Sequence, residues 1–172
     1  MLCLFATITI FSQELSKKEE KLYKLLMKYR KQNNLPAIPI SKSLTIIAQT
    51  HVKDLVENKP YIEGCNAHSW SSKGNWTACC YTPDHKNAAC MWSKPRELTS
   101  YAGNGYEIAC GSNLYCSEFI MTAEYAIQSW KKSPGHNAVI INQGGWADPW
   151  NAIGIGVYKG FAVVWFGRES EK

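Results

Sequence analysis

Four histidines are the side chains of this 172-residue chain best suited to chemistry near neutral pH, because the unperturbed pKa of imidazole lies in that range. His136 follows a Pro-Gly turn behind a helical pattern, in W-K-K-S-P-G-H-N, where the backbone holds the ring while a cleft can still reach it. His68 flanks another structured turn, in C-N-A-H-S-W. His51 lies on the apolar face of a predicted helix and is expected to bond a backbone carbonyl. His85 lies in the turn sequence T-P-D-H-K-N. We expect His51 and His85 to be passive, which leaves the other two as candidates for a site.

Two helices are predicted in the first third of the chain. Ser16 followed by Glu19 is a capping-box signature, and leucines at helical spacing follow until Asn33 ends the pattern. After a short extended stretch, Ser41 or Ser43 caps a second helix, whose apolar face carries one of the histidines. Both patterns are amphipathic, as expected of helices that cover a core.

A third helix and a hairpin are predicted in the last third. The helix runs from about Thr122 to Lys132, and Pro134 with the following glycine ends it. Residues 152–158 and 161–166 are β-rich runs, and the Lys159-Gly160 pair between them is a compact hairpin signal. Helices that precede an antiparallel sheet indicate an α+β fold.

The apolar segments and the net charge of the chain exclude some classes of protein. Residues 1–13 carry no charge and form an apolar run of the length of a signal peptide's core, so we expect a secretory signal, with a buried N-terminal strand or helix as the alternative. No segment is long and apolar enough to span a bilayer. The net charge is +5, and the Lys and Arg residues are concentrated in a stretch, 17–31, in which Glu19 and Glu20 are interleaved. This pattern is typical of a solvated helix face rather than a nucleic-acid surface.

Six cysteines remain once the predicted signal, which carries Cys3, is removed. An even number in a region rich in Gly, Asn, Ser and Trp predicts three disulfides in an exported protein. The neighbours Cys79 and Cys80 should have different partners, because a bond between adjacent cysteines strains the backbone. The connectivity stays open, and Cys110 with Cys116 would close the shortest loop. The six are Cys65, Cys79, Cys80, Cys90, Cys110 and Cys116.

Other catalytic and cofactor motifs are missing from the sequence. It contains no G-x-S-x-G, no H-E-x-x-H and no G-x-x-x-x-G-K, so no nucleotide cofactor is expected. The seven tryptophans and nine tyrosines either pack in the core or form a recognition surface, because flat rings give contact area at a small entropic cost. Tyr106, Trp146 and Trp150 are our candidates for such a ligand surface.

The segment from Trp130 to Val157 resembles the carboxyl-terminal half of the CAP superfamily, also called the SCP or PR-1-like family, in its bacterial form. The likeness rests on S-P-G-H, on an apolar turn that ends in I-x-N, and on a strand that begins I-G-x-G. The earlier A-Q-T-H looks like the family's A-Q-x-H helix. The resemblance covers about residues 20–168. It implies an α-β-α sandwich, with an antiparallel sheet flanked by helices and a long disulfide-rich excursion that forms one wall of a cleft.

The resemblance also implies a cavity built from two histidines and two glutamates. His68 resembles the histidine that opens the family's cavity motif, and His136 the one that closes it. Glu107, in G-N-G-Y-E-I-A, and Glu124, on the third helix, match the two glutamates best. Four such side chains would suit a divalent metal, Zn²⁺ first, because it accepts both nitrogen and oxygen ligands.

The sequence departs from the family pattern at one of these positions. It has Y-E-I-A where the bacterial pattern is G-E-N-I-A, so Tyr106 is an alternative occupant of the position given to Glu107. Glu97 and Glu118 are nearby alternatives for the carboxylates.

Two functions remain open after the resemblance is applied. The first, which we favour, is a secreted, non-enzymatic binding module that holds an extracellular lipid or sterol, a glycan or a protein. The second is an extracellular metal-assisted hydrolase that uses a metal-bound water in the same cavity. The family is defined by its scaffold rather than by one reaction, so its fold does not decide between them.

Overall fold

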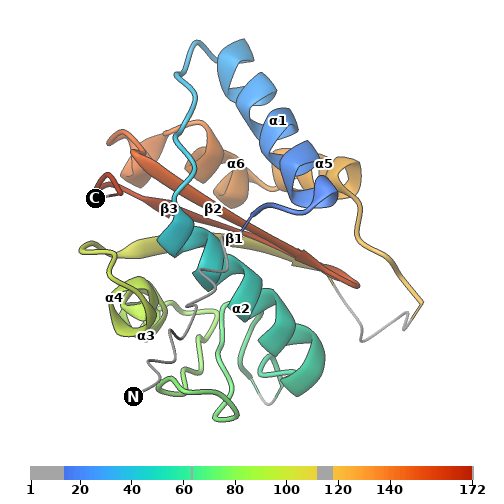
Figure 1. The fold of residues 1–172 in the computed structure, drawn as a ribbon, viewed down its shortest axis with the longest axis vertical. Helices are drawn as coiled ribbons and strands as arrows, with labels where there is room; N and C mark the ends of the chain where they lie inside the picture. The colour runs from blue at the N-terminus through green and yellow to red at the C-terminus, as the bar shows by residue number, and fades with distance from the viewer. Residues whose placement is uncertain (1–13, 63, 112–117, 172) are drawn as a thin grey trace, which may run out of the picture.

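A three-stranded antiparallel sheet lies between two layers of helices in the computed structural model, which describes residues 14–62, 64–111 and 118–171 (Figure 1). The strands are β1 (Gly105–Gly111), β2 (Ala152–Tyr158) and β3 (Phe161–Gly167), in the order β1-β3-β2. The predicted hairpin and the α-β-α sandwich are therefore confirmed. The sequence analysis missed β1, which forms one edge of the sheet.

The helices divide between the two faces of the sheet. On one face lie α1 (Lys17–Gln32), α5 (Ala123–Lys132) and α6 (Pro134–Ile140), and on the other lie α2 (Lys42–Asn58), α3 (Ala88–Trp92) and α4 (Lys94–Leu98) (Figure 1). A 3-10 turn, Gly144–Trp146, follows α6. Pro134 ends α5 as expected, but it also occupies the first turn of α6, where a missing N–H costs nothing. His136 therefore lies in a short helix rather than in a simple turn.

The first two helices begin at the predicted caps. The backbone N–H of Ser16 donates to Glu19 Oε2 at 2.7 Å, and the Ser16 hydroxyl accepts from the Glu19 N–H at 3.4 Å. Ser41, rather than Ser43, caps α2, and its hydroxyl accepts from the Leu44 N–H at 2.9 Å. The Ser43 hydroxyl instead donates to the carboxylate of Glu171 at 2.7 Å.

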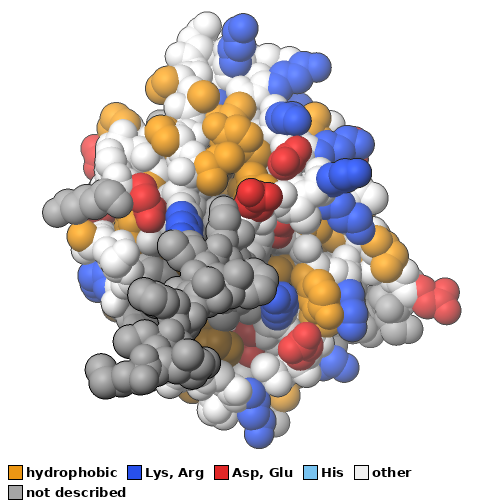
Figure 2. All heavy atoms as spheres, viewed as in Figure 1, with side chains coloured by type: hydrophobic (Ala, Val, Ile, Leu, Met, Phe, Trp, Pro, Cys, Tyr) orange, Lys and Arg blue, Asp and Glu red, His pale blue; other side chains and the backbone are white. Residues whose placement is uncertain are grey.

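The basic stretch predicted to be a solvated helix face is α1. Lysine and arginine side chains gather over α1 and the neighbouring α5 on the side seen in Figure 2. Lys21 pairs with Glu124 at 2.5 Å, and Lys24 pairs with Glu20 at 3.7 Å. No helix among the described residues has the length and apolar character needed to cross a membrane.

Side chains alternate between the two faces of each strand, and this alternation builds two separate cores. Ile108 on β1 and Phe166 on β3 pack with α1, α5 and α6. Ala109 on β1 and Trp165 on β3 pack with α2. Glu107 is paired with Trp165 in the register of β1 and β3, so it faces the α2 side.

Two glycines of the I-G-I-G pattern bring α2 close to the sheet. A Cβ added at Gly154 would lie 2.0 Å from the carbonyl carbon of Leu44, and one at Gly156 would lie 2.3 Å from the carbonyl oxygen of Ala48. Any side chain at either position would therefore push α2 away. This close approach fixes the distance between α2 and the sheet, and so determines how close the side chains of α2 lie to those of β1.

Two disulfides tie down the segment between α2 and α3. They join Cys65 to Cys80 and Cys79 to Cys90, so the adjacent cysteines have different partners, as predicted. Cys110 has no disulfide partner within the described residues. The predicted partner, Cys116, and the predicted signal at 1–13 lie outside them.

Candidate functional site

A cavity of about 460 Å³ lies between α3 and α6, next to the edge strand β1. This volume is within the usual range for small-molecule sites. Its walls are mainly aromatic and aliphatic, and three of its polar groups are imidazoles. The lining residues are His68, Tyr81, His85, Ala88, Met91, Trp92, Glu107, Ser133, Gly135, His136, Val139 and Trp146.

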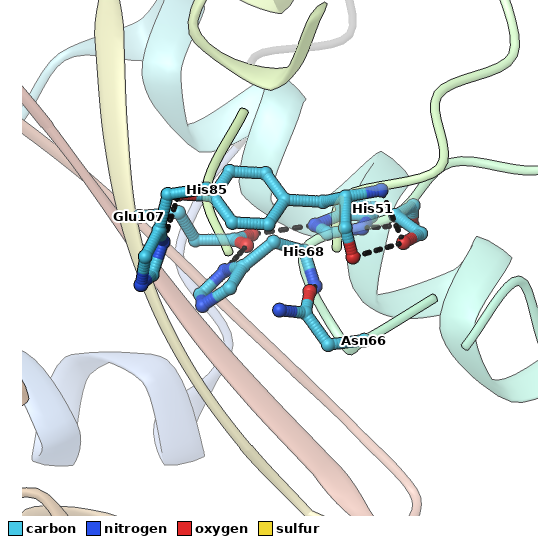
Figure 3. Close-up of polar contacts among 7 residues, drawn as sticks. His51, Asn66, His68, His85 and Glu107 are labelled. Carbon is cyan, nitrogen blue, oxygen red and sulfur yellow. Dashed lines mark hydrogen bonds and ion pairs between the residues drawn. The ribbon is translucent and has the colours of Figure 1, made fainter. Parts of the chain in front are cut away.

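Glu107 links the cavity to the interior of the α2 side. Its carboxylate is fully buried and bonds two imidazoles at once (Figure 3). Glu107 Oε1 lies 2.5 Å from Nδ1 of His51, and Oε2 lies 2.7 Å from Nδ1 of His68. The structure thus brings together His68 and Glu107, two of the residues that the resemblance implied, and adds a third that it did not.

His51 is the residue that the sequence analysis missed. Its ring is fully buried on α2, stacks on Trp70 with ring centroids 4.3 Å apart, and contacts the Ser69 carbonyl oxygen through Nε2 at 2.9 Å. The expected backbone contact is present, but the second nitrogen bonds Glu107. The sequence showed the burial of His51 but carried no signal for its partner, although a buried carboxylate needs a charged or hydrogen-bonding group beside it.

The pKa values of this pair move in opposite directions. Burial alone would raise the pKa of Glu107, but the adjacent His51 and His68 outweigh it and hold that pKa below its ordinary value. Burial alone would lower the pKa of His51, but the Glu107 carboxylate outweighs it and raises that pKa. Both shifts favour a carboxylate that faces an imidazolium inside the protein.

His136 and His85 face the same cavity from two other elements. Burial, followed by the proximity of His68, lowers the pKa of His136, which favours the neutral form of this imidazole. His85 is exposed, as predicted, and has a left-handed backbone with φ of 58°. It nevertheless lines the cavity, and its Nδ1 lies 2.9 Å from the Tyr81 hydroxyl. His85, which we expected to be passive, therefore lies at the site.

Glu124 does not join this cluster. Helix α5 packs on α1 through Ala123, Ile127 and Trp130, which leaves position 124 pointing toward solvent. The Glu124 side chain is 54% exposed and forms an ion pair with Lys21 at 2.5 Å. The two alternatives do not replace it, because Glu118 is exposed and Glu97 bonds the ammonium of Lys94.

The three aromatic residues predicted to form a ligand surface have different environments. Trp146 is half-buried and lines the cavity. Tyr106 is half-buried against Trp92 and Trp146, with ring centroids 5.4 and 5.3 Å away. Its side chain packs with the α1 side of the sheet, so it does not replace Glu107. Trp150 is buried in the core, and its ring N–H donates to the Val139 carbonyl at 2.8 Å, so it is not part of an exposed surface.

These positions do not fit a metal centre with three or four protein ligands. Within the described residues, no group of three or more His, Cys, Asp and Glu side chains is arranged to hold a metal ion. Both oxygens of Glu107 and Nδ1 of His68 already bond one another or His51. The imidazoles of His68, His85 and His136 keep a ring nitrogen without a protein partner among the described contacts, but they are not placed so that all three could hold one ion. Zinc binding stays a prediction, and no step is assigned to a metal.

The fold and the cavity together define a class of protein, a three-layer sandwich with a His/Glu-lined cavity at the edge of its sheet. A family model described as "CAP: Cysteine-rich secretory protein family" matches residues 23–162. The chain therefore belongs to this family. No curated protein matches it in sequence.

Solved structures of bacterial surface and extracellular proteins share the fold. An outer surface protein of Borrelia burgdorferi has a TM-score of 0.58 and 18% identity, and the match covers 92% of this chain and 97% of that one. An extracellular protein of Bacillus anthracis that contains an SCP domain has a TM-score of 0.57 and 17% identity, over 91% of this chain and 45% of that one.

A cysteine-rich secretory protein of Staphylococcus aureus has a TM-score of 0.54 and 14% identity, over 91% of this chain and 41% of that one. This chain thus spans less than half of the Bacillus and Staphylococcus proteins. At these identities the likeness shows the fold alone.

Proposed function

We propose that this protein is an exported binding module that holds an apolar small molecule in the cavity between α3 and α6. The observation that carries the proposal is the composition of the cavity wall. Met91, Trp92, Val139 and Trp146 offer apolar surface around a few polar groups, which is the usual design of a ligand site. Export is supported by the two disulfides and by the extracellular or surface origin of the structural neighbours.

The polar groups of the cavity favour binding over hydrolysis. The Glu107 carboxylate, the natural general base of such a site, has both oxygens occupied by imidazoles and is fully buried. It would have to give up one of these bonds to take a proton from water. The metal-assisted hydrolase remains the alternative prediction.

Calorimetric titration with linear alcohols of six to twelve carbons tests the proposal. Each added methylene buried in the cavity contributes about 0.8 kcal/mol, so the affinity should rise about fourfold per carbon until the cavity is full. An affinity that does not depend on chain length would contradict the proposal.

Two glycines provide a matched pair of variants for this titration. Gly135 lines the cavity, and a Cβ added there meets nothing within 4 Å, so Gly135→Phe should fill the cavity without disturbing the backbone. Gly145 is equally free of contacts but does not line the cavity. We expect Gly135→Phe to lose alcohol binding and Gly145→Phe to keep it. Equal binding by both would place the ligand elsewhere.

The hydrolase alternative has its own readout. Zn²⁺-dependent cleavage of a labelled casein, lost in His68→Gln and in His136→Gln, would favour it over the binding module.

A further inference from the structure

A chain of three hydrogen bonds runs from the backbone into the cavity. It starts at the Ser69 carbonyl oxygen, which contacts Nε2 of His51 at 2.9 Å. It continues from His51 Nδ1 to Glu107 Oε1 at 2.5 Å, and from Glu107 Oε2 to His68 Nδ1 at 2.7 Å (Figure 3). The last residue lines the cavity, and no hydrogen bond in the described part of the chain involves its Nε2.

The backbone carbonyl determines where the protons of this chain lie. A carbonyl oxygen only accepts, so Nε2 of His51 carries a hydrogen. One further proton must lie between His51 Nδ1 and Glu107 Oε1, on either atom, for that contact to be a hydrogen bond. If Oε1 holds that proton, Oε2 has none. If His51 Nδ1 holds it, His51 is an imidazolium, and a further proton on Oε2 would leave this buried charge without its counter-ion, so Oε2 is again bare. In both cases Oε2 can only accept. His68 Nδ1 must therefore be the donor.

We infer that the Ser69 carbonyl, His51 and Glu107 act as positioning groups that hold His68 in the tautomer with a protonated Nδ1, so that a bare Nε2 faces the cavity. The inference holds for both places of the shared proton. It rests on the three contacts, on the acceptor character of a peptide oxygen, and on the cost of a buried imidazolium without its counter-ion.

The tautomer selects the kind of ligand, and this step rests on the proposed binding function. A bare Nε2 accepts a hydrogen bond, so the polar group that meets it must be a donor. Together with the apolar walls, this favours an apolar alcohol over an ether or a fatty-acid carboxylate.

Nitrogen-15 NMR of histidine-labelled protein at pH 8, above the ordinary imidazole pKa of about 6.5, tests the tautomer directly. The resonances of His68 are assigned with His68→Gln. We expect Nδ1 of His68 in the protonated range and Nε2 in the unprotonated range. Free histidine in water favours the opposite tautomer, so a protonated Nε2 in the wild type would overturn the inference.

Two variants separate positioning from general structural support. In Glu107→Gln the amide NH₂ can donate to His51 Nδ1 while the amide oxygen accepts from His68, so the tautomer should persist. In His51→Phe the ring can still stack on Trp70, but a buried Glu107 without its partner takes up a proton and can donate to His68 Nδ1. The tautomer should then invert. Inversion in Glu107→Gln would overturn the inference, and so would persistence in a folded His51→Phe.

The ligand class is tested with 1-decanol, its isomer methyl nonyl ether, and decanoate. We expect the alcohol to bind about tenfold more tightly than the ether, the difference of one hydrogen bond in a buried site. Decanoate should bind more weakly than the alcohol. Equal affinities would overturn the ligand class while the binding module stands. If no probe binds, the proposed function fails and the ligand class with it, whereas the NMR result still decides the tautomer.

Discussion

The two sides of the sheet bury charged side chains in different ways. On the α1 side, Arg30 is almost fully buried and donates to the carbonyl oxygens of Pro36 and Ile140 at 3.0 and 2.6 Å, and to Asn142 at 2.7 Å. On the α2 side, buried side chains bond one another, from His51 through Glu107 to the cavity.

The difference shows how the same burial can serve two purposes. Arg30 joins α1 to the end of α6, and each of its contacts ends on an acceptor inside the protein. Burial lowers its pKa to about 10, so it stays charged at neutral pH. The chain on the α2 side ends on a side chain that can still bind something else. Burial of charge is thus a sign of function where the hydrogen bonds lead to a cavity.

The largest effect is expected from the apolar packing of the α1 side. Trp130 is fully buried among the residues that join α5 to the sheet. Trp130→Ala should destabilise the protein by about 3–5 kcal/mol, because it leaves a large cavity in the core. Urea denaturation measures the change. A loss below about 1 kcal/mol would mean that this side of the sheet does not depend on tight packing.

Replacement of the buried pair on the α2 side tests whether it serves stability. His51→Leu or Glu107→Leu alone should each cost about 3–5 kcal/mol, since each leaves a buried polar partner without its bond. The double variant should cost less than either single one, because leucines can pack in an apolar core. A double variant whose cost equals the sum of the two single costs would show that the two side chains are not coupled, and would contradict this expectation.

The dependence of this pair on pH follows from the direction of its shifts. The folded pKa of Glu107 lies below its ordinary value of 4.5. Its stabilising contribution is therefore complete above that value and is lost as the pH falls through the folded pKa. Denaturation curves between pH 3 and 7 should show this loss in the wild type and not in the double leucine variant.

A smaller effect is expected where α2 meets the sheet. Gly154→Ala places a methyl group against the backbone of Leu44 and should cost about 1–3 kcal/mol. Because α2 carries His51, this variant should also perturb the NMR signals of His68. Gly135→Ala is the control, since a Cβ there meets no atom within 4 Å. Equal stability of the two alanine variants would contradict the role given to close packing.

The smallest effect on stability is expected at the cavity wall. Trp146 is half-buried, so Trp146→Ala should cost less than about 1 kcal/mol. It should nevertheless weaken alcohol binding, because the ring is part of the wall. A loss of stability close to that of Trp130→Ala would place this ring in the core.

Local signals in the sequence predicted the parts of the fold that depend on neighbouring residues. The capping box at Ser16, the cap at Ser41 and the hairpin at Lys159 each involve only a few adjacent positions. Strand β1 was missed because its sequence, G-Y-E-I-A-C-G, places a glutamate among inward-facing residues and has glycine at both ends. The hydrogen-bond partner that allows this glutamate to be buried is His51, which lies 56 positions earlier, so no local pattern in the sequence predicts it.

The predicted site residues that rested on sequence motifs lie together in the structure. The one whose position depends on how its helix is rotated does not lie with them. His68, Glu107 and His136 line one cavity. Glu124 fails to join them because the rotation of α5 is set by the packing of Trp130, which a spacing rule does not describe. His51 looked passive for a related reason, since burial on an apolar face is visible in the sequence and the carboxylate opposite it is not.

The position of Glu107 on an edge strand has a consequence for solubility. In the described sheet, β1 pairs with β3 alone, so it is an edge strand, the kind of strand at which two molecules can pair. Without the glutamate, the run from Tyr106 to Cys110 would be uncharged and apolar on both faces, the composition that favours self-association between chains. An inward-pointing charge on an edge strand is one of the features that disfavour such pairing, and Glu107 provides one here before any ligand is bound.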